Sequence, residues 1–129
     1  MLDHVTITAA DFPAARGFYD AVLGALGLVR LDALVDEEEE QPAVEAVAWG
    51  RPDGPSIVWL VGGSAPTTGL HLRLRADARG QVEAFHAAGV QAGGSAHAAP
   101  RRWPIYRRGE FNAIVRDPQG NLIEAVSAE

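Results

Sequence analysis

Residues 2–9 of the chain read Leu-Asp-His-Val-Thr-Ile-Thr-Ala, and this stretch predicts the first element of the fold. His4, Thr6 and Thr8 alternate with the apolar residues between them, which is the period of two residues that is typical of a half-buried strand. We therefore expect a strand with one apolar face and one polar face, and the polar face begins with a histidine.

The sequence after this strand predicts a helix and three more strands. Asp11 is suited to cap a helix over about residues 12–25, because Pro13 is tolerated in the first turn and apolar residues then recur every three or four positions. Alternating and apolar segments predict the strands at Leu28–Leu34, Val44–Trp49 and Ser56–Val61. The first half thus has the order β-α-β-β-β.

The second half repeats this pattern. Shifting the chain by 67 residues places His71 on His4 and Phe85 on Phe18, so strand falls on strand and helix on helix. We expect a strand at Leu70–Ala76, a helix over about Ala78–Ala88, a weak strand near Val90–Ala92, a loop through Pro104, and strands at Glu110–Arg116 and Leu122–Ser127 joined by the turn 117–121. This organisation predicts one α+β domain, residues 1–129, with module one at 1–62, a linker at 63–68 and module two at 69–129.

Composition limits the function classes. The chain has 129 residues and no cysteine, so a thiolate nucleophile or a cysteine-ligated zinc site is excluded. Its net charge is −6, which does not favour binding to nucleic acid. There is no apolar stretch of the roughly 20 residues that span a bilayer, and the N-terminus does not resemble a signal peptide. We expect a cytoplasmic protein that acts on a small molecule, with no membrane partner.

Several motifs together resemble one known family. They are His4-Val5-Thr6-Ile7, Asp11 with Phe18-Tyr19 and Leu23-Gly24, His71 at the start of a strand, and the run Asp-Pro-Gln-Gly-Asn-Leu-Ile-Glu-Ala-Val at residues 117–126. This set is similar to the glyoxalase/bleomycin-resistance/dioxygenase group, the vicinal-oxygen-chelate superfamily. The resemblance extends over nearly the whole chain. It implies paired βαβββ modules that form a curved, barrel-like mixed sheet around a metal and substrate cavity, with the helices outside.

The resemblance also implies a metal site. Members that use a metal take ligands from the first and last strand of each module, and these positions are His4, His71, Glu124 and Trp59 here. Because tryptophan does not bind metal ions, the predicted ligands are His4, His71 and Glu124. Two imidazoles and one carboxylate with open coordination positions suit Fe, Mn, Ni or Zn as divalent ions.

Other side chains have both a structural and a functional interpretation. Trp59 is a core residue or a wall of the substrate cavity. Arg73 and Arg75 share a strand face with His71, so they either bind an anionic substrate or form ion pairs. Tyr106 packs or contacts the substrate, and Thr6 lies on the same side as His4. We therefore take Thr6, Tyr106 and Glu124 as candidate catalytic residues, and Trp59, Arg73 and Tyr106 as candidate substrate-binding residues.

The expected function is that of a metalloenzyme that binds an oxygen-rich small molecule and stabilises an oxyanion or enolate. Glyoxalase-like lyase, dioxygenase and thiol-transferase chemistry remain open. Trp59 disfavours the first, the second usually needs a further histidine, and the ion-binding loop of the third has no counterpart near Tyr106. The alternative is a metal-free, drug-sequestering protein similar to the bleomycin-resistance proteins, for which the acidic balance suits cationic drugs. The family resemblance and the exposed edges of open sheets also predict a homodimer.

Overall fold

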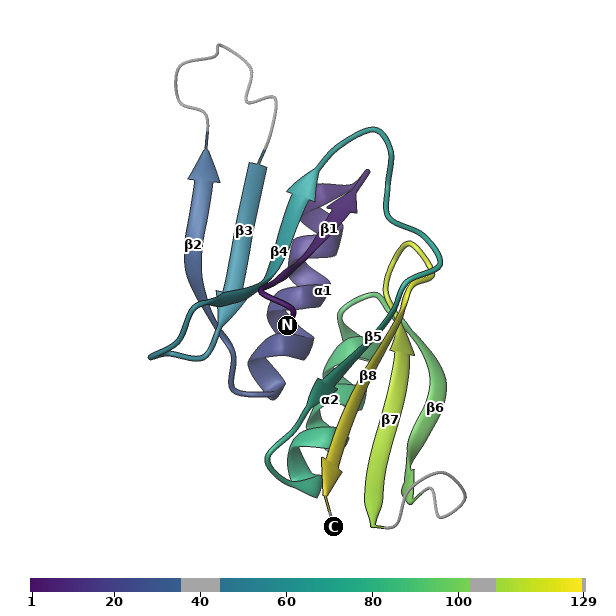
Figure 1. Ribbon diagram of the computed structural model, residues 1–129. Coiled ribbons are helices and arrows are strands. Elements are labelled where there is room, and N and C mark those ends of the chain that lie inside the picture. Colours follow the sequence, from purple (N-terminus) through teal and green to yellow (C-terminus); the bar gives the residue numbers. More distant parts are fainter. Residues whose placement is uncertain (36–44, 103–108, 129) are drawn as a thin grey trace.

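Two βαβββ modules follow one another along the chain, as the repeat predicts (Figure 1). The computed structural model describes residues 1–35, 45–102 and 109–128. Module one contains β1 (Val5–Ala9), α1 (Phe12–Ala25), β2 (Val29–Val35), β3 (Glu45–Gly50) and β4 (Ser56–Gly62). Module two contains β5 (His71–Arg75), α2 (Arg79–Gln91), β6 (Ser95–Arg102), β7 (Glu110–Arg116) and β8 (Leu122–Ala128).

Each module forms its own four-stranded mixed sheet. The strand orders are β1-β4-β3-β2 and β5-β8-β7-β6, and in each sheet the first strand is parallel to the last strand of its module while the other pairs are antiparallel. The α+β class and the paired modules are thus confirmed, although the two sheets of one chain do not close into a barrel.

Each helix packs on the sheet of its own module, and the sequence pattern explains how α1 does so. Asp11 caps α1 by accepting a hydrogen bond from the Ala14 amide at 3.2 Å, and Phe18, Val22 and Leu23 then fall on one fully buried stripe. The two helices also contact each other, and both lie on the same side of the sheets (Figure 1). One face of each sheet is therefore buried under a helix, and in residues 1–35, 45–102 and 109–128 no helix or strand covers the opposite face, which we call the uncovered face (Figure 1).

One region of module two differs from the sequence prediction. The weak strand expected near Val90–Ala92 is wrong, because α2 continues to Gln91, and the predicted loop contains β6 instead. Gly89 does not end the helix: a Cβ there would come within 3.0 Å of Val115 and 3.1 Å of Val22, so glycine allows a close approach of α2 to its neighbours. The helix ends just before Gly93, whose φ of 101° suits glycine.

The turn between β7 and β8 connects the two modules through buried polar contacts. Asp117 accepts a hydrogen bond from the Tyr19 hydroxyl of α1 at 2.6 Å and one from the Asn121 side chain at 2.9 Å. Gln119 donates to the main-chain oxygens of Thr8 and Thr67. We call this set, Tyr19, Thr67, Asp117, Gln119 and Asn121, the Asp117 network. It gives most of the Asp-Pro-Gln-Gly-Asn motif a structural role.

Among the described residues, no helix is long and apolar enough to cross a membrane.

Candidate metal and substrate site

The uncovered face of the module-two sheet brings two of the predicted metal ligands together. His71 on β5 and Glu124 on β8 lie on adjacent parallel strands, and His71 Nε2 is 2.8 Å from Glu124 Oε1. The Glu124 side chain is only 5% exposed, whereas that of His71 is 50% exposed. The pair thus combines a buried, fixed carboxylate with an imidazole that solvent or a ligand can reach.

Neighbouring donors hold the second oxygen of Glu124. Asn112 Nδ2 donates to Oε2 at 2.6 Å, and Arg73 Nε donates to it at 3.2 Å. Burial alone would raise the pKa of Glu124, but the hydrogen bonds from Asn112, His71 and Arg73 outweigh it and hold that pKa below its ordinary value. Glu124 is therefore an anion at neutral pH, with Oε1 oriented toward His71.

His4 comes from module one and is exposed immediately before β1. Its Nδ1 lies 2.7 Å from Asp3 Oδ2, and Nε2 has no hydrogen-bond partner among the described residues. A carboxylate on one ring nitrogen is the usual support of a histidine that binds a metal through the other. Asp3 was not among the site residues expected from the sequence, although its position next to His4 could have pointed to it.

Strand register places Trp59 in module one where Glu124 stands in module two. Thr6 is the partner of Trp59 in the parallel β1–β4 pair, and Arg73 is the partner of Glu124 in the parallel β5–β8 pair. Arg73 is 67 residues after Thr6, the same spacing that separates His71 from His4. The repeat therefore also makes their strand partners, Trp59 and Glu124, equivalent positions in the two modules. The indole of Trp59 is partly buried on the uncovered face of its sheet.

One chain does not assemble the full predicted ligand set. In residues 1–35, 45–102 and 109–128, no three histidine, aspartate or glutamate side chains gather closely enough to hold a metal ion. His71 and Glu124 meet, and His4 is on the other module. Thr6 is exposed on β1, two residues after His4, and Tyr106 lies outside the described residues.

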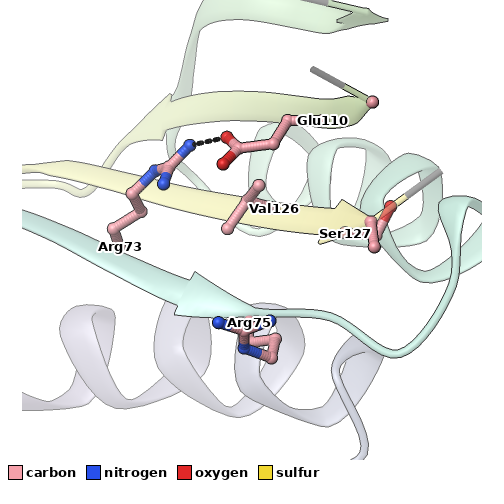
Figure 2. Close-up of a pocket in the computed structure, with 7 residues that line it drawn as sticks. Arg73, Arg75, Glu110, Val126 and Ser127 are labelled. Carbon is pink, nitrogen blue, oxygen red and sulfur yellow. Dashed lines mark hydrogen bonds and ion pairs between the residues drawn. The ribbon is translucent and has the colours of Figure 1, made fainter. Parts of the chain in front are cut away.

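Arg73 and Arg75 line a pocket of about 230 Å³ on the module-two face. Figure 2 shows Arg73 paired with Glu110, while Arg75 lies apart from that pair at the end of β5. Arg73 thus fits the ion-pair interpretation through Glu110 and Glu124, and at the same time it lines a pocket. Asn112 and Glu110 were not among the site residues expected from the sequence. The only signal for them there is that they are two residues apart in a predicted strand, which places their side chains on the same face.

The comparisons with known proteins decide the family. The sequence model described as Glyoxalase/Bleomycin resistance protein/Dioxygenase superfamily matches residues 1–125. The chain belongs to this superfamily. No protein with a curated description matches the chain.

Solved structures of the superfamily share the fold. A glyoxalase/bleomycin resistance protein from Albidiferax ferrireducens T118 is 28% identical, with a TM-score of 0.72 and 98% of each chain covered. A family enzyme from Burkholderia phytofirmans PsJN is 16% identical, with a TM-score of 0.66, 98% of this chain and 97% of that chain covered. The V278E mutant of glyoxalase I from Zea mays is 18% identical with a TM-score of 0.65, and the match covers 95% of this chain and 43% of that longer one.

The donor atoms present fit a divalent metal ion. Two ligands bound at right angles about 2.1 Å from one ion lie about 3 Å apart, which is near the separation of His71 Nε2 and Glu124 Oε1. Asn112 and Arg73 support the carboxylate, and Asp3 supports His4, as the neighbours of metal ligands usually do.

Proposed function

We propose that the chain is a metal-dependent enzyme of the glyoxalase superfamily that binds an oxygen-rich small molecule. The observation that carries this proposal is the contact of His71 Nε2 with Glu124 Oε1 on the uncovered face of module two. His71, Glu124 and His4 are the proposed ligands, and Fe, Mn, Ni and Zn remain the candidate ions. A bound ion would act as a Lewis acid toward neighbouring substrate oxygens.

The protein side chains have separate tasks in this proposal. Arg73 and Asn112 fix the orientation of Glu124 through its Oε2 atom, so they act as positioning residues. Trp59 and Thr6 line the wall that module one contributes to the substrate cavity. Trp59 adds no ligand, which leaves coordination positions for the substrate.

A homodimer is the assembly that completes such a site. In one chain α1 contacts α2, and in the described part of the chain no helix or strand lies over the sheet faces that point away from the helices. His71 and Glu124 contact each other on β5 and β8, and His4 lies immediately before β1. We infer that module one of one copy faces module two of a second copy, so that each of two equivalent sites takes His4 from one chain and His71 with Glu124 from the other. A location in the cytoplasm stays a prediction.

Metal binding tests the proposal directly. Isothermal titration of the chelator-treated protein with Mn, Ni or Zn should give one site per chain, and His71→Ala should weaken binding at least tenfold, because one of three protein ligands is lost. His97→Ala is the matched control, since His97 is exposed on β6. If His71→Ala binds as tightly as His97→Ala, the proposed ligand set is wrong.

Metal-free sequestration of a small molecule is the second candidate. Two observations favour it: tryptophan occupies the fourth ligand position, and the guanidinium of Arg73 already neutralises Glu124. A thermal-shift screen of metabolites and antibiotics, with and without added metal, separates the two candidates, because a ligand of the folded state raises the melting temperature. Shifts that need no metal, together with no metal affinity in the titration above, favour sequestration.

A further inference from the structure

We propose that the pocket beside the His71–Glu124 pair is an anion subsite, in which Arg75 binds a carboxylate or phosphate group of the ligand. This inference rests on the proposed function in one respect, because it names a chemical group of the small molecule that the proposed metal site would bind. All seven lining residues belong to module two of one chain, so the subsite itself needs no second copy: Arg73, Arg75, Gly109, Glu110, Val126, Ser127 and Ala128.

The two arginines of the pocket differ in what already binds them. Arg73 pairs with Glu110 and with Glu124. Arg75 makes no hydrogen bond or ion pair among the described residues, and its side chain is exposed. A guanidinium offers several donors in a planar fork that matches a carboxylate or phosphate. Arg75 therefore has its full donor set available for a ligand.

Strand geometry places the guanidinium of Arg75 on the same face of β5 as His71. His71, Arg73 and Arg75 alternate along β5 and share its uncovered face, and Val126 is the partner of Arg75 on β8. The pocket volume of about 230 Å³ is below the roughly 300–1,000 Å³ typical of whole drug-sized ligands. It suits one group of a ligand whose remainder extends toward His71 and the other wall of the cavity.

The module-one face has a different chemistry. The row across its sheet that corresponds to Arg75 contains Thr8, Val61, Ala46 and Leu34, and Leu34 is 62% exposed. Trp59 lies in the adjacent row. If the two faces meet between copies, Trp59, Val61 and Leu34 of one copy lie opposite Arg75 of the other, and together they fit an anion with an apolar or aromatic body. The charged side chains of the lining, Arg73, Arg75 and Glu110, sum to +1, so the pocket can hold an anion although the net charge of the chain is −6.

The test uses three probes that share an aromatic body: phenylacetate, phenyl phosphate and the neutral phenylacetamide. Their affinities for the full-length protein are measured by isothermal titration calorimetry. At least one anion should bind more tightly than the amide, and Arg75→Gln should weaken that anion roughly tenfold or more while changing amide binding little. Which anion is preferred distinguishes a carboxylate ligand from a phosphate ligand. Arg16→Gln, which removes the same charge from α1, is the control and should bind like the original protein.

Other outcomes overturn the inference. If neither anion binds more tightly than the amide, or if Arg75→Gln behaves like Arg16→Gln, Arg75 is no anion site. If anion affinity falls in His71→Ala but not in Arg75→Gln, the anion binds at His71 and not at Arg75. The metal titration tests the proposed function separately. A protein that binds no metal could still bind the anion through Arg75, so the two proposals fail in different experiments.

Discussion

At the scale of single residues, the repeat gave more information than any motif taken alone. The match of His71 with His4 predicted a shared position in two modules, and the pairing of Thr6 with Trp59 and of Arg73 with Glu124 confirms that register. What the sequence could not provide were the partners of Glu124 across the sheet. Asn112 reaches it only because β7 and β8 pair antiparallel in one particular register.

Trp59 allows a test of the module-one wall. Trp59→Glu adds a carboxylate at the position equivalent to Glu124, so we expect divalent metals to bind at least tenfold more tightly in calorimetric titration. Trp59→Gln is the control, because it changes size in the same way without adding charge. Equal metal affinity in the two variants would mean that Trp59 does not face the metal.

Asp20 gives a pH-dependent contribution to stability. Burial alone would raise its pKa, but hydrogen bonds from Arg30 and Trp49 lower it below the ordinary value. A depressed folded-state pKa stabilises the protein above the unfolded pKa of about 3.9, and this contribution is lost as pH falls through the folded value. Urea unfolding from pH 7 to pH 3 should therefore show a smaller loss of stability in Asp20→Asn than in the original protein. An identical pH dependence would contradict this role.

At the scale of elements, periodicity predicted the elements that have a clear apolar face, and it failed for β6. The segment Ser95–Arg102 is rich in alanine and has no strand pattern. It nevertheless pairs with β7, with register shifts between Ala96 and Ala98 and between Ala98 and Arg101. Strand formation there depends on the neighbouring strand more than on local preference. The turn motif, by contrast, was recognisable in the sequence, but its role in joining the modules depends on Tyr19 of α1.

The Asp117 network predicts a large cost for a small change. Burial, the Asp117 charge and their hydrogen bond raise the pKa of Tyr19, so its hydroxyl stays protonated and donates to Asp117. Tyr19→Phe removes that donor from a buried carboxylate and should lower the free energy of unfolding by about 1–3 kcal/mol. Chemical denaturation measures the change. A Tyr19→Phe variant as stable as the original would show that the Asn121 side chain and the amides of Gln119 and Asn121 satisfy Asp117 without the hydroxyl.

At the scale of the whole molecule, sequence could define two modules but not their relative placement. Local patterns do not contain the information that α1 packs on α2, with both helices on the same side of the sheets and no helix or strand over the opposite faces in the described part of the chain. The two sheets of one chain do not close into a barrel, so the barrel-like closure expected from the sequence would need a second copy. This makes the assembly, more than any single residue, the property on which the proposed site depends.

A mixing experiment tests whether two copies share each site. His4→Ala and His71→Ala should each bind metal weakly when purified alone. After the two variants are unfolded together and refolded, a dimer with shared sites contains one site with both substitutions and one site with His4, His71 and Glu124 all intact. Random pairing should restore metal binding at about one site in four, since half of the dimers are mixed and each has one intact site of two. Titration of the mixture, with each variant refolded alone as the control, measures this fraction. No recovery in a mixture that light scattering shows to be dimeric would place each site within one chain and refute the shared assembly.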